Sequence, residues 1–115
     1  MKIILASKNQ DKIKEIGKIL NRSNRTLVTC NDMDIPEVEE TGSTFVENAI
    51  LKARSASLST GLPAIADDSG IEVDYLNAEP GIKSARYSGE NATNESNNLK
   101  LLGALNGVSC EDRKA

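Results

Sequence analysis

Two adjacent aspartates, Asp67 and Asp68, end a short apolar run that begins at Ala64. Such a run predicts a buried strand. Carboxylates at its end are unfavourable unless a positive group compensates them, because each charge taken out of water costs several kcal/mol. Open α/β sheets hold their ligands at the carboxyl ends of the strands, where a cation can meet such acids. The acid pair therefore favours an α/β sheet with a charged site at one edge.

The rest of the chain alternates between strand-like and helix-like patterns. The predicted strands are 2–6, 26–30, 64–67 and 71–76, and the predicted helices are 10–20, 45–59 and 94–105. Asn9 is a suitable N-cap, and Thr44 with Glu47 fits a capping box. The first helix has an apolar face made by Ile13, Ile16, Ile19 and Leu20. This order predicts one α/β domain over residues 1–115, with a mixed central sheet flanked by helices.

Composition excludes several kinds of chemistry. The 115 residues include no histidine, which rules out histidine-dependent triads and histidine-ligated zinc on this chain. The net charge is -3 and the only aromatic residues are Phe45, Tyr75 and Tyr87, so we expect no nucleic-acid partner. Chemistry must rest on carboxylates, lysines, hydroxyls and a hard metal ion.

The sequence shows no pattern typical of a membrane span or a signal peptide. No apolar stretch reaches ~18 residues, so no membrane partner is expected. The first ten residues are too short for a signal peptide. Cys30 and Cys110 have no metal-binding spacing and are expected to be reduced. These features predict a cytoplasmic protein.

The segment from Ser7 to Lys12 follows the first strand and opens the first helix. Backbone N–H groups at a helix N-terminus attract anions. Ser7, Asn9 and Lys12 are therefore candidate phosphate contacts, and the alternative is an ordinary cap with a solvated lysine. The glycine pattern of a P-loop is absent.

Two further groups lie in the middle of the chain. Glu37, Glu39 and Glu40 belong either to an acidic surface loop or to a Mg²⁺ site, because Mg²⁺ prefers oxygen ligands. Asn48 and Lys52 share one helix face, which could meet phosphates or only water. The acid pair itself could bind a divalent cation, or one aspartate could cap a turn while the other is solvated.

The segment 83–87 contains a lysine, a serine, an arginine and a tyrosine. It could clamp a substrate, since an arginine such as Arg86 suits phosphate or carboxylate. We favour the alternative that this segment has a structural or interface role.

Several long segments, in this order, resemble the inosine triphosphate pyrophosphatase (Ham1-like) family. They are ASKNQDKIKEI, EETGSTFVENAILKA, LPAIADDSGIEVDYL and EPGIKSARYSGE, and the resemblance extends over essentially the whole chain. The resemblance implies an ITPase-like (Maf-like) fold and Mg²⁺-dependent hydrolysis of noncanonical purine nucleoside triphosphates (dITP, ITP, XTP) to the monophosphate and pyrophosphate. It also implies a homodimer.

The resemblance also implies residue roles. Asp68 matches the proton acceptor and a metal ligand, and Glu39 matches the metal ligand of the acidic loop. Lys52 and Ser69 match substrate contacts. The triphosphate-binding stretch matches Ser7, Lys8, Asn9, Gln10, Asp11 and Lys12, although Lys8 stands where the family often has glycine.

The chain departs from the family pattern at its end. The family's later Phe-Gly-Tyr-Asp and Ser-His-Arg motifs, which supply much of the purine pocket, are not in this sequence. We therefore expect a domain whose C-terminal portion is missing. The alternatives are an impaired remnant or split-protein subunit that binds nucleotide phosphates or a partner chain, and a fragment without independent function.

Overall fold

The computed structural model describes all 115 residues of the chain. These residues form two compact units, Met1–Asp68 and Ser69–Ala115, and each is described by itself. The expectation of a single domain stays a prediction.

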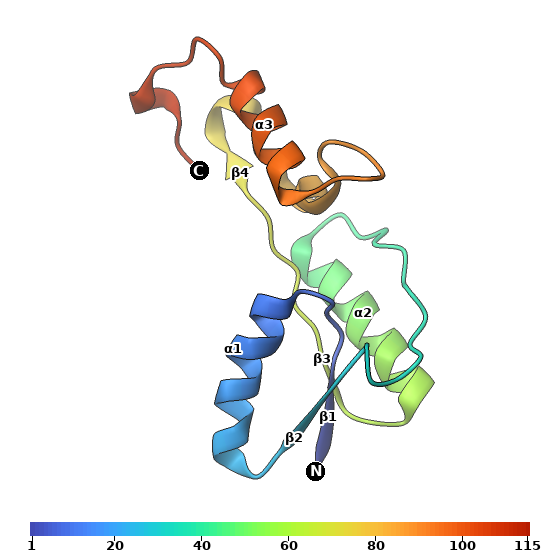
Figure 1. Ribbon diagram of the computed structural model, residues 1–115. Coiled ribbons are helices and arrows are strands. Elements are labelled where there is room, and N and C mark those ends of the chain that lie inside the picture. Colours follow the sequence, from blue (N-terminus) through green and yellow to red (C-terminus); the bar gives the residue numbers. More distant parts are fainter. The chain divides into compact units, whose positions relative to one another are not determined.

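The first unit is a three-stranded parallel sheet with two α-helices. Its elements are β1 (Lys2–Leu5), α1 (Gln10–Leu20), β2 (Thr26–Thr29), α2 (Phe45–Thr60) and β3 (Ala64–Ile65). The strand order is β2-β1-β3, and both pairs are parallel. Figure 1 shows α1 and α2 on opposite sides of these strands. The crossover from β1 to β2 and the crossover from β2 past β1 to β3 run in opposite directions, so right-handed connections place their helices on opposite faces of the sheet.

The core of the first unit forms around β1. Ile4 and Leu5 are fully buried, and Ile3 and Ala6 are nearly so. Strands of a parallel sheet covered on both faces have continuous apolar runs of this kind. Ala56 brings α2 against Ile4 and Ala6, which completes the buried cluster.

The predicted helices start at the expected caps, with one difference in detail. The side chain of Thr44 accepts a hydrogen bond from the Glu47 backbone N–H (3.2 Å), as a capping box requires. The Glu47 carboxylate, however, accepts from the backbone N–H of Ser43 (2.8 Å), one residue before the cap. Ile19 is 68% exposed, so the predicted apolar face of α1 is narrower than expected.

The second unit is built from short elements. They are β4 (Glu72–Val73), β5 (Glu79–Pro80), α3 (Asn94–Ala104) and 3₁₀ turns at Asp74–Leu76, Gly81–Arg86 and Cys110–Asp112. The predicted strand 71–76 is therefore only two residues long. Asn77 and Ala78 have positive φ angles (54° and 68°), and this turn reverses the chain so that β4 pairs antiparallel with β5. No strand was predicted at Glu79 and Pro80, which form that partner strand.

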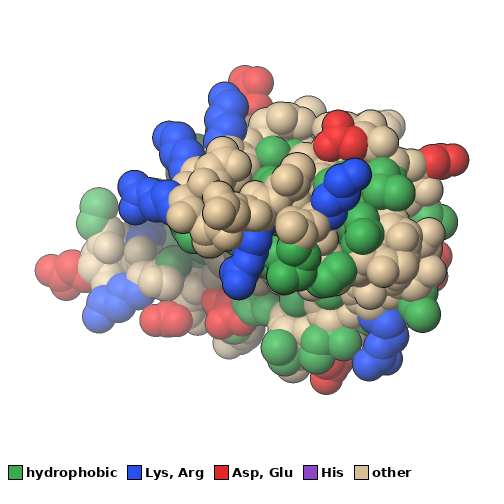
Figure 2. Space-filling model, turned by 90° about the horizontal axis from the view of Figure 1, so that it is seen from below, with side chains coloured by type: hydrophobic (Ala, Val, Ile, Leu, Met, Phe, Trp, Pro, Cys, Tyr) green, Lys and Arg blue, Asp and Glu red, His purple; other side chains and the backbone are tan.

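The α/β class is confirmed, but the strands do not form one mixed sheet. The parallel strands and the antiparallel pair belong to separate sheets. None of the helices is both long enough and apolar enough to span a membrane. Figure 2 shows hydrophobic side chains at the surface among charged ones. By their exposed fractions, Val46, Leu58 and Leu99 are each more than half exposed.

Candidate active site

The candidate site lies at the carboxyl edge of the parallel sheet. β1 and β3 are adjacent and parallel, so the residues that follow them meet at the same edge. The chain leaves β1 toward α1 and enters β3 from α2, and these helices cover opposite faces. This is the topological switch point at which open α/β sheets form a ligand crevice. Lys12 follows β1 through the start of α1, and Asp67 and Asp68 follow β3 after a single residue, Ala66.

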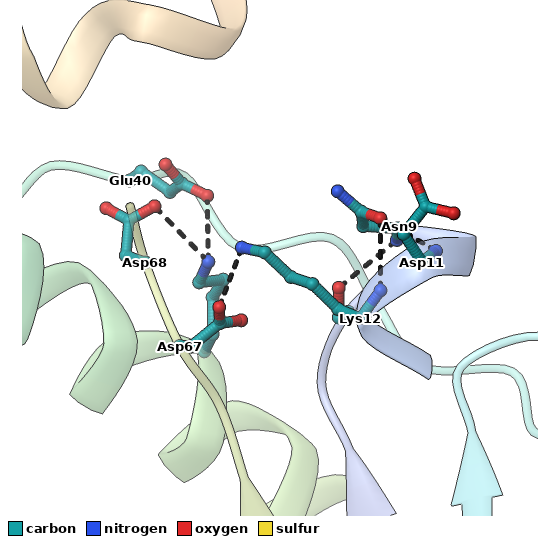
Figure 3. Close-up of polar contacts among 8 residues, drawn as sticks. Asn9, Asp11, Lys12, Glu40, Asp67 and Asp68 are labelled. Carbon is teal, nitrogen blue, oxygen red and sulfur yellow. Dashed lines mark hydrogen bonds and ion pairs between the residues drawn. The ribbon is translucent and has the colours of Figure 1, made fainter. Parts of the chain in front are cut away.

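Ion pairs join these segments (Figure 3). The Lys12 Nζ atom lies 2.7 Å from Asp67 Oδ2. Lys52 Nζ, from α2, lies 3.6 Å from Asp68 Oδ1 and 3.5 Å from Glu40 Oε1 in the acidic loop. Three carboxylates therefore face two ammonium groups, and negative charge is left in excess.

The acid pair keeps unused oxygen atoms. Asp67 Oδ1 and Asp68 Oδ2 are buried and have no hydrogen-bond partner. The Asp68 side chain is only 11% exposed, although it carries a charge. Buried polar atoms are nearly always hydrogen-bonded, so such orphans call for an explanation. A cation or a water molecule bound to these two carboxylate oxygens would explain why neither has a partner within the protein.

The start of α1 is organised by Asn9. Its Oδ1 atom accepts hydrogen bonds from the backbone N–H groups of Asp11 (3.0 Å) and Lys12 (3.3 Å). The backbone N–H of Asn9 in turn donates to Ser7 Oγ (3.1 Å). Asn9 is thus an ordinary N-cap, one of the alternatives left open by the sequence. Lys12 is not simply solvated, because it is ion-paired with Asp67.

Lys8 connects the same segment to the acidic loop through an ion pair with Glu37. The hydrogen bond and charge of Glu37 raise the pKa of Lys8, and those of Lys8 lower the pKa of Glu37. Both side chains are largely exposed, so this pair contributes little to stability.

The structure brings only part of the predicted site together. Lys12, Lys52 and Asp68 belong to the ion-paired cluster. Gln10 and Asp11 are exposed at the first turn of α1, and Ser69 is exposed at the start of the second unit. Their substrate contacts stay predictions.

The acidic loop differs most from expectation. Glu39 is exposed, and Glu40 is the residue that faces Lys52. The sequence offered both glutamates but did not single out Glu40 as the partner of Lys52. The buried Asn48 was noticed only as a neighbour of Lys52, and its contact with Gly42 was missed.

The residues present fit a magnesium ion that also binds phosphate. No three acidic, cysteine or histidine side chains converge as a complete protein cage for a metal. Mg²⁺ does not need one, since it is usually held by one or two carboxylates together with waters and substrate phosphates. The orphaned oxygens of Asp67 and Asp68 are donors of the required kind.

Comparison with known proteins identifies the family. A family model described as the Ham1 family matches residues 3–115. The chain belongs to the Ham1 family. The resemblance seen in the sequence motifs is therefore confirmed.

Relatives in the Ham1 family are close in sequence. The chain is 55% identical over 115 residues to the dITP/XTP pyrophosphatase of Thioalkalivibrio sulfidiphilus, covering 100% of this chain and 59% of that protein. It is 52% identical over 114 residues to the dITP/XTP pyrophosphatase of Vibrio cholerae, covering 99% of this chain and 57% of that protein. The chain thus spans little more than half the length of these relatives.

Solved structures agree with the fold. A HAM1 protein from Coxiella burnetii matches with a TM-score of 0.83 and 47% identity, over 92% of this chain and 54% of that one. A nucleoside-triphosphatase / dITP/XTP pyrophosphatase from Mycobacterium abscessus matches with a TM-score of 0.79 and 43% identity, over 98% of this chain and 60% of that one. The ITPase-like fold is confirmed over this part.

Proposed function

We propose that this chain hydrolyses noncanonical purine nucleoside triphosphates, such as dITP, ITP and XTP, to the monophosphate and pyrophosphate in a Mg²⁺-dependent reaction. The observation that carries the proposal is the cluster of Asp67, Asp68, Lys12 and Lys52 at the switch point of the sheet. The similarity to Ham1 relatives that are dITP/XTP pyrophosphatases supports the choice of substrate.

In this proposal the two lysines exchange partners when the triphosphate binds. Lys12 and Lys52 each hold a carboxylate in the structure. Phosphate oxygens offer them more negative charge, and charge neutralisation with positioning supplies most of the catalysis in phosphoryl chemistry. Ser7, Lys8, Asn9 and Gln10 border the same edge through the start of α1 and are proposed to contact the triphosphate, with Asp11 beside them.

Asp68 is proposed to act on the attacking water. Its buried Oδ2 has no partner, so it can accept a hydrogen bond from water and then the proton. The water oxygen bonds to the α-phosphorus, the bond from that phosphorus to the bridging oxygen breaks, and pyrophosphate leaves. Lys52 pairs with the other oxygen of this carboxylate, Oδ1, and so would hold Asp68 in place beside the water.

Asp67 and Asp68, whose orphaned oxygens are free to bind, would hold Mg²⁺, and Glu40 would stabilise the ion from its place beside Lys52. Glu39 stays a predicted ligand. When bound, Mg²⁺ supplies positive charge against the triphosphate. The carboxylates place that charge at the strand end, and they repel a triphosphate that arrives without it.

The predicted partners go with this function. A second copy of this chain, or a partner chain, stays the predicted protein partner, and sedimentation at micromolar concentration tests it. The cytoplasmic location also stays a prediction.

The activity is tested by measuring pyrophosphate release from dITP with Mg²⁺. We expect turnover by the wild-type chain and a decrease in kcat of about 10²–10⁴-fold for Asp68→Asn, the range for loss of a general base. Asp74→Asn is the matched control, because Asp74 is an exposed aspartate in the second unit. It should leave kcat unchanged.

Two results would count against the proposal. Equal turnover by wild type and Asp68→Asn would remove Asp68 from the chemistry. Binding of dITP without turnover would favour the alternative of a protein that only binds nucleotide phosphates.

A further inference from the structure

One hydrogen bond fixes the acidic loop to α2. The backbone N–H of Gly42 donates to Oδ1 of Asn48 at 2.7 Å. Asn48 lies in the first turns of α2, and its side chain is 0% exposed. A buried polar side chain that accepts from a loop backbone is a suitable anchor, because water cannot compete for the bond.

Gly42 lets the loop come close enough for this bond. A Cβ atom at residue 42 would lie 2.6 Å from Asn48 Oδ1 and 2.7 Å from Glu47 Cβ. Both distances are shorter than real Cβ contacts, so a larger residue would push the loop away from α2. The glycine and the asparagine therefore depend on each other.

The same face of α2 holds the loop at a second point. Asn48 and Lys52 are four residues apart and hence lie one above the other on the helix. Asn48 binds Gly42, and Lys52 pairs with Glu40 at 3.5 Å. Only Thr41 separates the two loop residues. Fixing Gly42 consequently limits where the Glu40 carboxylate can be.

Packing alone does not favour an asparagine at residue 48. Its Nδ2 atom is buried without a hydrogen-bond partner. The amide cannot rotate to improve this, since only its oxygen can accept from the Gly42 N–H. An unsatisfied buried donor is unfavourable, whereas alanine would carry no such penalty. The benefit of the asparagine is the position of the loop.

We propose that Asn48 is a positioning residue that holds the acidic loop so that Glu40 faces Lys52 and Asp68. The inference rests on the proposed function in one respect, namely that the carboxylates of Glu40 and Asp68 take part in binding a divalent cation. Asn48 touches neither substrate nor metal in this scheme. It acts through Gly42 on Glu40.

The test compares amide exchange with metal affinity. Hydrogen exchange of the Gly42 amide is measured by NMR, and Mn²⁺ alone is titrated as the metal probe. For Asn48→Ala we expect Gly42 exchange at least about tenfold faster and Mn²⁺ affinity about 10–100-fold weaker, the usual effect of removing an outer-shell partner. Asn48→Asp keeps an acceptor and should keep the slow Gly42 exchange.

Two further variants test whether a loss of Mn²⁺ affinity in Asn48→Ala comes from the moved loop or only from misfolding. Gly42→Ala displaces the loop without altering the buried face of α2, and it should weaken Mn²⁺ binding in the same range. Arg54→Gln is the matched control, because Arg54 is an exposed residue of the same helix. It should leave both measurements unchanged.

Unchanged Mn²⁺ affinity in both Asn48→Ala and Gly42→Ala would overturn the proposal. A wild-type chain with no Mn²⁺ affinity would overturn the metal site and this role of Asn48 together. A wild-type chain that binds Mn²⁺ but releases no pyrophosphate from dITP overturns the proposed function alone, and the role of Asn48 is then decided by the exchange rates and affinities.

Discussion

The two units of the chain achieve order in different ways. In Met1–Asp68 a parallel sheet buries Ile4 and Leu5 completely and carries a cluster of ion pairs at its carboxyl edge. In Ser69–Ala115 the buried apolar side chains are fewer, namely Val73, Pro80 and Leu105. Turns and polar side chains hold most of that unit.

The polar contacts of the second unit show this clearly. Ser84 Oγ accepts from the Ile71 backbone N–H (2.9 Å) and donates to the Gly81 carbonyl. Gly70 packs so closely here that a Cβ would overlap both Gly81 and Ser84. Lys100 donates to the Tyr87 carbonyl (2.7 Å) and lies over the Tyr87 ring. Charges near a rigid buried sheet can support chemistry, whereas these contacts mainly shape the backbone.

The largest expected effect concerns the core. Ile4→Ala should lower the free energy of unfolding by about 2–5 kcal/mol, because it leaves a cavity in a fully buried site. Leu105→Ala in the second unit should fall at the lower end of that range, since its few buried neighbours can collapse into the space. Urea denaturation measures both, and an equal or larger loss from Leu105→Ala would break the contrast between the units.

The second largest expected effect is on kcat and comes from removing a positive charge at the candidate site. Lys52→Met leaves Asp68 and Glu40 without their shared cation, and we expect kcat for dITP to fall about 10²–10³-fold, as when one charge-stabilising donor is removed. Lys100→Met removes a lysine from the second unit and should not change kcat. Steady-state kinetics of the two variants decide whether the chemistry belongs to the first unit.

The N-terminal caps of α2 and α3 should contribute equally to stability in the two units. The Thr44 side chain caps α2, and the Thr93 side chain caps α3 by accepting from the Ser96 N–H (3.1 Å). Thr44→Ala and Thr93→Ala should each cost about 1 kcal/mol, because the same local hydrogen bond is lost. Thermal unfolding measures them. A clear difference would show that the caps depend on their surroundings as well.

The smallest effect depends on pH. Hydrogen bonds from the backbone and side chain of Ser43 lower the pKa of Glu47 below its ordinary value of 4.5. Its contribution to stability is therefore complete above that value and is lost as the pH falls through the lower, folded-state pKa. Glu47→Gln should lower the Tm at pH 7 and approach wild type at acid pH. Ser43→Ala, which keeps the backbone donor, should show a weaker pH dependence.

Much of the first unit could be predicted because its signals are local. The run from Ile3 to Ala6 indicates a buried strand, and Asn9 and Thr44 mark the starts of α1 and α2. The acid pair at the end of β3 pointed to the site. The second unit was harder, since a 3₁₀ turn at Asp74–Leu76 ends the strand after Val73, although the strand-like alternation continues to Tyr75.

By itself the sequence determined which groups are available: a chain without histidine, rich in carboxylates and lysines, with an apolar run that ends in two aspartates. Only the tertiary structure decided which of them meet. Glu40 faces Lys52, Lys12 pairs with Asp67, and Asn48 holds Gly42. Such pairings join segments whose separation along the chain carries no periodic signal, so they follow only once parallel strands and two helices have brought the segments to one edge of the sheet.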